Sequence, residues 1–102
     1  MNNLFCYGTL QDSEIQEKHI GRIIKGIPDK LAGFGKSKIK LNGKIYPILI
    51  PQKDSVIEGE VFSVTDNEMK KIDEYEGDAY KRINVRLESG KIAMVYIKNL
   101  WL

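Results

Sequence analysis

The group with the clearest chemical potential in this sequence is the carboxylate of Glu76, at the expected end of a short helix. Thr65–Glu68 is a capping-box pattern, in which a hydroxyl and a carboxylate three residues apart satisfy free amides at a helix start. Gly77 is the residue type that most easily adopts the left-handed conformation after a helix end. At about 100° per residue, Met69 and Ile72 define the apolar stripe, and Glu76 falls on the same face. The pattern predicts a partly buried carboxyl group, whose raised pKa suits a general acid or base near neutral pH.

A second position is open to this carboxylate. The helix macrodipole disfavours negative charge at the C-terminal end of a helix, where Glu76 is expected. The Glu76 side chain could therefore bend toward water or pair with Lys81 or Arg82 instead. The residues alone favour neither position.

Few other side chains could carry catalysis. The chain has one histidine, His19, and one cysteine, Cys6. His19 lies in a charged segment and is expected at the surface, whereas Cys6 lies in an apolar run and is expected in the core. The two cannot compose an ordinary zinc site or a Cys-His nucleophile pair, so no metal is expected. By elimination, an enzyme built from this chain would use a lone carboxylate aided by backbone amides.

Tyr7, Gly8, Thr9 and Leu10 follow a compact apolar segment and are expected to form a loop after a buried strand. Gly8 lets the backbone approach a ligand closely, and successive free amides after a strand can bind an anion. Taken alone, these residues are explained more simply by a plain strand-to-loop turn. Tyr80 and Tyr46 are likewise expected in structural positions.

Composition limits the classes of protein that are possible. The 102 residues predict a single domain, residues 1–102, and the formal net charge of +2 comes from 16 basic and 14 acidic residues, too balanced to indicate a nucleic-acid partner. The lysines between Lys36 and Lys44 alternate with apolar residues, as on the solvated face of a strand. A single cysteine suits a reducing compartment, and no apolar run approaches the ~20 residues of a membrane span. With a polar start unlike a signal peptide, the sequence predicts a cytoplasmic protein without a membrane partner.

The remaining segments predict an α+β fold. A second short helix is expected near residues 13–20 with Ser13 at its cap, and Asn42-Gly43 is a strong hairpin signal. Pro28-Asp29 is expected to interrupt a strand, and Gly33 to mark a bulge or bend. Strands are expected at residues 3–7, 22–27, 31–41, 44–50, 56–64, 82–87 and 92–98. This count of about six or seven strands with two short helices favours a small mixed β-barrel, closed or partly closed, with the helices on its flank.

Taken in order, these segments resemble the gamma-glutamylcyclotransferase-like family, of the gamma-glutamylamine cyclotransferase type. The resemblance spans nearly the whole chain and rests on an ordered set of short motifs. They are Tyr7-Gly8-Thr9-Leu10, Tyr46-Pro47, Val56–Phe62 (VIEGEVF), Asp73–Gly77 (DEYEG) and Tyr80-Lys81-Arg82.

The resemblance implies a small-molecule γ-glutamyl substrate and an enzyme that needs no cofactor. In this family the α-amino group of a γ-glutamyl unit attacks its own γ-carbonyl, giving 5-oxoproline and releasing an amine or amino acid. This reaction is an acyl transfer or a lyase-type release. Glu76 takes the position of the family's acid/base, and the Tyr7–Leu10 loop takes that of the substrate-holding loop. Tyr46, Tyr80 and Arg82 complete the expected substrate-binding residues.

Two other classes of function are compatible with the same residues. A non-catalytic binding module could keep the pocket for a small carboxylate-bearing ligand or a protein partner. A basic β-barrel could bind RNA, which would require salt-sensitive binding to oligonucleotides. The oligomeric state and the leaving amine do not follow from the sequence.

Overall fold

A computed structural model of the protein describes residues 1–99. These residues form five strands, two α-helices and one 3-10 helix. In chain order they are β1 (Asn2–Cys6), η1 (Thr9–Gln11), α1 (Ser13–His19), β2 (Ile27–Leu41), β3 (Lys44–Val64), α2 (Asp66–Glu76), β4 (Tyr80–Arg86) and β5 (Ile92–Lys98). The predicted α+β class is confirmed.

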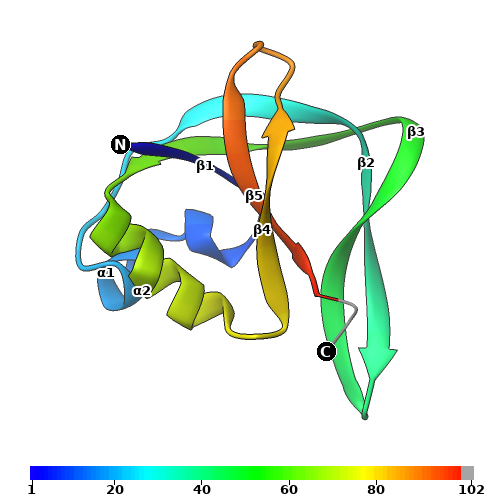
Figure 1. The fold of residues 1–102 in the computed structure, drawn as a ribbon, viewed down its shortest axis with the longest axis horizontal. Helices are drawn as coiled ribbons and strands as arrows, with labels where there is room; N and C mark the ends of the chain where they lie inside the picture. Colours follow the sequence, from blue (N-terminus) through cyan, green and yellow to red (C-terminus); the bar gives the residue numbers. More distant parts are fainter. Residues whose placement is uncertain (100–102) are drawn as a thin grey trace.

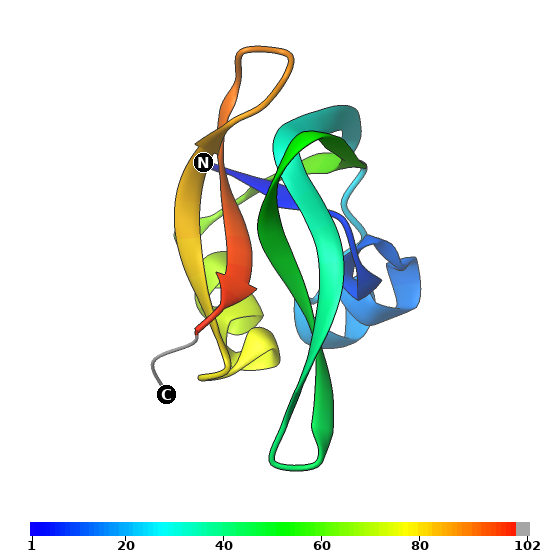
Figure 2. The same cartoon turned by 90° about the vertical axis from the view of Figure 1, so that its right-hand side faces the viewer.

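The strands form one mixed sheet in the order β2-β3-β1-β5-β4. β1 runs parallel to β5, whereas the other neighbouring pairs are antiparallel. The sheet curls into a half-barrel, and α1 and α2 lie together on one flank (Figure 1). Figure 2 shows the tip of the β2–β3 hairpin extending beyond the rest of the molecule. The predicted partly closed barrel with flanking helices therefore describes the observed architecture.

The strand count is five in the described chain, not six or seven. Residues 44–50 and 56–64 form the single strand β3, and the strand predicted at residues 31–41 begins at Ile27 as β2, so no separate strand precedes it. The pairing register shifts between Ala32 and Phe34 of β2, which leaves residues 52–55 of β3 opposite Gly33 alone. Asp54 takes a positive φ of 68° in this bulge. The polar residues therefore bend the hairpin without ending the strand, and the bulge predicted at Gly33 is confirmed.

The start of β2 also differs from the expectation. Residues 22–26, predicted to begin a strand, form a loop. Here the amide of Ile24 donates to Oε1 of the buried Gln16 (2.8 Å), so a side chain replaces a strand partner. Pro28, predicted to interrupt a strand, lies at the second residue of β2, where an edge strand near its start tolerates the missing donor.

Local signals specify both helices. Oγ1 of Thr65 accepts from the amide of Glu68 (3.1 Å), and the Glu68 carboxylate accepts from the amide of Thr65 (2.9 Å), which confirms the predicted capping box of α2. Gly77, with φ of 73°, follows the last residue of α2. At α1 the cap is Asp12, one residue earlier than predicted, because its carboxylate accepts from the amide of Glu14.

Two apolar clusters, one on each face of the sheet, form the core. Leu4 of β1 packs with Met69 and Ile72 of α2, which are 4% and 0% exposed, whereas Phe5 of β1 packs on the opposite face with Val95. β1 is thus buried on both faces, and Leu4 packs one of these faces against α2. None of the described helices has the length and apolar character needed to cross a membrane.

Candidate active site

A cavity of about 300 Å³ lies between the sheet and the end of α2. Every strand contributes to its wall, together with the loop after β1, η1 and α2. The lining residues are Phe5, Cys6, Tyr7, Gly8, Thr9, Leu10, Lys36, Pro47, Ile48, Glu76, Tyr80 and Tyr96. Its volume lies at the lower end of the range for small-molecule sites, and its wall is mostly apolar.

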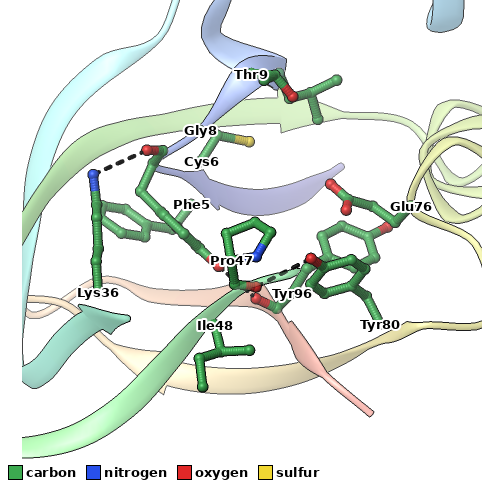
Figure 3. A pocket seen from close by; sticks show the side chains of 12 residues that line it. Phe5, Cys6, Gly8, Thr9, Lys36, Pro47, Ile48, Glu76, Tyr80 and Tyr96 are labelled. Atoms are coloured by element: carbon green, nitrogen blue, oxygen red, sulfur yellow. Dashed lines mark hydrogen bonds between the residues drawn. The ribbon is translucent and has the colours of Figure 1, made fainter. Parts of the chain in front are cut away.

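Glu76 supplies the carboxyl group of this cavity. It is the last residue of α2, and the buried Met69 and Ile72 fix the face on which it lies. Figure 3 shows its carboxyl group pointing into the cavity, toward the end of β1. The alternative pairing with Arg82 does not occur, because the Arg82 guanidinium binds Asp73.

Burial raises the pKa of Glu76 to about 7. Among the described residues, no hydrogen bond or ion pair engages its carboxylate to lower that value. At neutral pH both protonation states are therefore populated, so the group can accept a proton and return it.

Tyrosine hydroxyls beside Glu76 are committed to backbone carbonyls. Tyr7 donates to the carbonyl of Tyr96 (3.1 Å). Tyr80 donates to the carbonyl of Pro47 (3.1 Å), as drawn in Figure 3. Burial, assisted by the charge of Glu76, raises the pKa of Tyr7 and of Tyr80. Both phenols stay protonated and join separate walls of the cavity.

The loop after β1 presents unused donors. In the described part of the chain, no hydrogen bond uses the amides of Gly8, Thr9 or Leu10. A Cβ at Gly8 would meet nothing within 4 Å, so packing inside the protein does not explain the glycine. These amides can therefore serve as donors to an anion or a carbonyl group in the cavity.

A direct hydrogen bond ties this loop to α2. Thr9 Oγ1 lies 2.6 Å from the hydroxyl of Tyr75, the residue before Glu76. The His19 ring packs against Tyr75 with a centroid distance of 4.4 Å. The loop and the end of α2 are therefore held in a fixed relation.

The structure brings together six of the eight residues expected at the site. Tyr7, Gly8, Thr9, Leu10, Glu76 and Tyr80 line the cavity. Tyr46 is not among the lining residues, and Lys98 Nζ lies 4.9 Å from its ring centroid. Arg82 is also outside the lining, at its ion pair with Asp73.

Sequence reasoning missed two polar members of the wall. Lys36 is exposed, as expected for a solvated face, but its Nζ also donates to the carbonyl of Tyr7 (3.2 Å), because the curl of the sheet carries β2 to the cavity. No local pattern distinguishes Lys36 from its neighbours. Tyr96 carried a signal, since strict alternation in β5 places it on the face that meets α2.

The described residues contain no group of three or more His, Cys, Asp or Glu side chains arranged to hold a metal ion. Cys6, predicted in the core, is buried, and burial raises its pKa. The thiol is therefore a neutral part of the cavity wall.

The fold and the cavity define a small α+β domain with one carboxyl group in an apolar small-molecule pocket. The family model described as "Gamma-glutamyl cyclotransferase, AIG2-like" matches residues 4–100. The chain belongs to this family, as the sequence resemblance indicated.

Individual relatives agree with this placement. The chain is 34% identical to AIG2-like protein D and 31% identical to AIG2-like protein B, both of Arabidopsis thaliana, over 85% of its length. It spans 57% and 50% of those two proteins, about half their length.

Solved structures share the fold. A structure of a gamma-glutamyl cyclotransferase superposes with a TM-score of 0.81 at 17% identity, covering 96% of this chain and 66% of that one. A solution structure of an Arabidopsis thaliana protein superposes with a TM-score of 0.77 at 26% identity, covering 99% of this chain and 70% of that one.

Proposed function

We propose that this protein cyclises the γ-glutamyl unit of a small amine or peptide to 5-oxoproline and releases the amine, with Glu76 as the general acid/base. The observation that carries the proposal is a carboxyl group with a pKa of about 7, free of hydrogen bonds from the described residues, inside a small-molecule cavity. Membership in the cyclotransferase family supports the choice of reaction.

In the proposed reaction, Glu76 makes two proton transfers. The ionised Glu76 carboxylate takes a proton from the substrate's α-ammonium group, and the freed nitrogen attacks the γ-carbonyl carbon. A new C–N bond forms, and the carbonyl oxygen becomes an oxyanion. The protonated Glu76 then returns its proton to the leaving nitrogen as the original amide bond breaks and the oxyanion reverts to a carbonyl. The new ring nitrogen loses its second surplus proton, which the released amine takes up as an ammonium ion. A pKa near the working pH serves both steps.

The surrounding wall supports this chemistry in two ways. The free amides of Gly8, Thr9 and Leu10 are donors for the developing oxyanion or the substrate carboxylate. A cavity of about 300 Å³ favours a folded γ-glutamyl chain, in which the α-amino group lies close to the γ-carbonyl.

The substrate-binding residues in this proposal are Tyr7, Gly8, Thr9, Leu10 and Tyr80. Tyr46 and Arg82 are omitted from direct contact with substrate, because neither lines the cavity. The proposal extends to a cytoplasmic, single-domain enzyme, which a lone buried thiol suits.

The test is a screen of γ-glutamyl amines and γ-glutamyl dipeptides, with 5-oxoproline and the released amine measured by mass spectrometry. The proposal predicts equal amounts of both products from at least one compound, and no release by Glu76→Gln protein. Thermal stabilisation by a compound without product would refute turnover and leave a non-catalytic binding module.

A further inference from the structure

Arg82 lies outside the cavity but contacts the helix that carries Glu76. Its Nε lies 2.9 Å from Oδ1 of Asp73, and its Nη2 donates to Oδ2 at 3.0 Å. This is a bidentate pair, the geometry that fixes orientation as well as attraction. Asp73 lies three residues before Glu76, one turn earlier on α2.

Tyr96 binds the same carboxylate from the neighbouring strand. Arg82 and Tyr96 are paired across β4 and β5. The Tyr96 hydroxyl donates to Oδ1 of Asp73 (2.5 Å), while Tyr96 also lines the cavity. Two adjacent strands thus hold one side chain of α2 through two hydrogen bonds and one further ion-pair contact.

The Asp73 contact acts at the end of α2, where it adds to the hydrogen bond between Thr9 and Tyr75, whereas separate contacts hold the beginning of the helix. The capping box and the ion pair from Arg22 to Glu68 fix the first turn. At the other end no described side chain binds the Glu76 carboxylate. Its direction is therefore set by the position of the last turn.

We infer that Arg82 is a positioning residue: with Tyr96 it clamps Asp73, and this clamp holds the last turn of α2 so that Glu76 points into the cavity. The contribution to global stability is small, because Arg82 and Asp73 are 35% and 39% exposed. The inference about geometry is independent of turnover, whereas its consequence for catalysis rests on the proposed function.

The direction of a pKa change separates positioning from simple charge removal. Removing a nearby cation alone would raise the pKa of Glu76. Release of the last turn would instead let the carboxylate reach water and lower that pKa from about 7 toward its ordinary value of 4.5.

An Arg82 variant leaves every other titratable side chain that faces Glu76 in place. The titratable groups around Glu76 are Cys6 and Tyr7 at the end of β1, Tyr80 on β4 and Tyr96 on β5, with Lys36 of β2 also in the wall. β3 contributes only Pro47 and Ile48. Asp73 is the charged neighbour on α2 itself.

The experiment compares Arg82→Met with Lys81→Met, which removes a cation from the adjacent, exposed position of β4. Carbon-13 NMR titration of the Glu76 carboxyl carbon, assigned by its loss in Glu76→Gln, gives the pKa without any substrate. We expect a lower pKa in Arg82→Met and the wild-type value in Lys81→Met. With an active substrate, kcat should fall about tenfold or more in Arg82→Met, with a smaller change in KM.

An unchanged or higher Glu76 pKa in folded Arg82→Met protein would overturn the inference, whatever the activity. If Arg82→Met does not fold, Arg82→Gln is judged by the same criterion. Absence of turnover in the wild type would refute the proposed function, while the NMR titration would still decide the positioning role.

Discussion

Replacing Glu76 by glutamine should stabilise the fold at alkaline pH, even though it should abolish activity. The ionised carboxylate of Glu76 is poorly solvated in the folded protein, which is why burial raises its pKa from 4.5 to about 7. A neutral amide of similar size avoids that cost. An active-site group that is unfavourable for folding is a common source of a stability–activity trade-off.

The sign and size follow from proton linkage. Below the unfolded pKa of 4.5 both states carry the proton, and Glu76 causes no loss of stability. As pH rises, the unfolded state releases its proton first, so stability falls until the folded group has also ionised, above about 7. The full shift corresponds to about 3 kcal/mol, and partial contact of Glu76 with water reduces our expectation to about 2 kcal/mol.

Urea denaturation of wild type and Glu76→Gln gives the free energy of unfolding of each protein, measured at about pH 4.5 and at about pH 8.5 on either side of the pKa shift. The variant should match the wild type at the lower pH and exceed it by about 2 kcal/mol at the higher pH. Glu74→Gln is the matched control, because Glu74 lies two residues earlier on α2 and is exposed. Equal pH dependence in the wild type and Glu76→Gln would refute the reasoning.

Three further outcomes are expected. kcat/KM for 5-oxoproline release should rise with pH through about 7 and then level, because Glu76 must be ionised to accept the first proton. A pH profile without that rise would count against Glu76 as the base. Gly59→Ala should lower the free energy of unfolding by about 2 kcal/mol, because the new Cβ would overlap the carbonyl oxygen of Cys6; an unchanged melting temperature would contradict this. Gly8→Ala should leave stability unchanged, since its Cβ meets nothing within 4 Å, but should raise KM by narrowing the cavity. An unaltered KM would show that substrate does not approach Gly8.

Local sequence signals predicted the elements that carry the acid/base. The capping box, the Met69 and Ile72 stripe and Gly77 together define where α2 begins, which face it buries and where it ends. These signals put Glu76 on the buried face of α2, because each acts within a few residues, but they left open whether its carboxylate would turn to water or to Lys81 or Arg82. The cavity and the Arg82–Asp73 ion pair of the structure decide that point. The hairpin at Asn42-Gly43 was predictable for the same reason, and both residues have the positive φ values that such a turn requires.

Features that depend on distant partners were not predictable in the same way. The break expected near residues 51–55 became a bulge because β2 pairs with β3 on both sides of it. The family resemblance implied a substrate-binding role for Arg82, but only the packing of α2 against β4 shows Asp73 as its partner. Lys36 reaches the cavity through the curl of the sheet, which no short pattern encodes.

The most direct test of the account measures 5-oxoproline release by wild type, Glu76→Gln and Glu74→Gln proteins on the best γ-glutamyl compound. Both variants replace one carboxylate of α2 by an amide, and only one of these groups lies in the cavity. The account predicts release by wild type and Glu74→Gln, with a loss of at least about 100-fold in Glu76→Gln. Comparable release by folded Glu76→Gln protein would contradict the assignment of Glu76 as the acid/base.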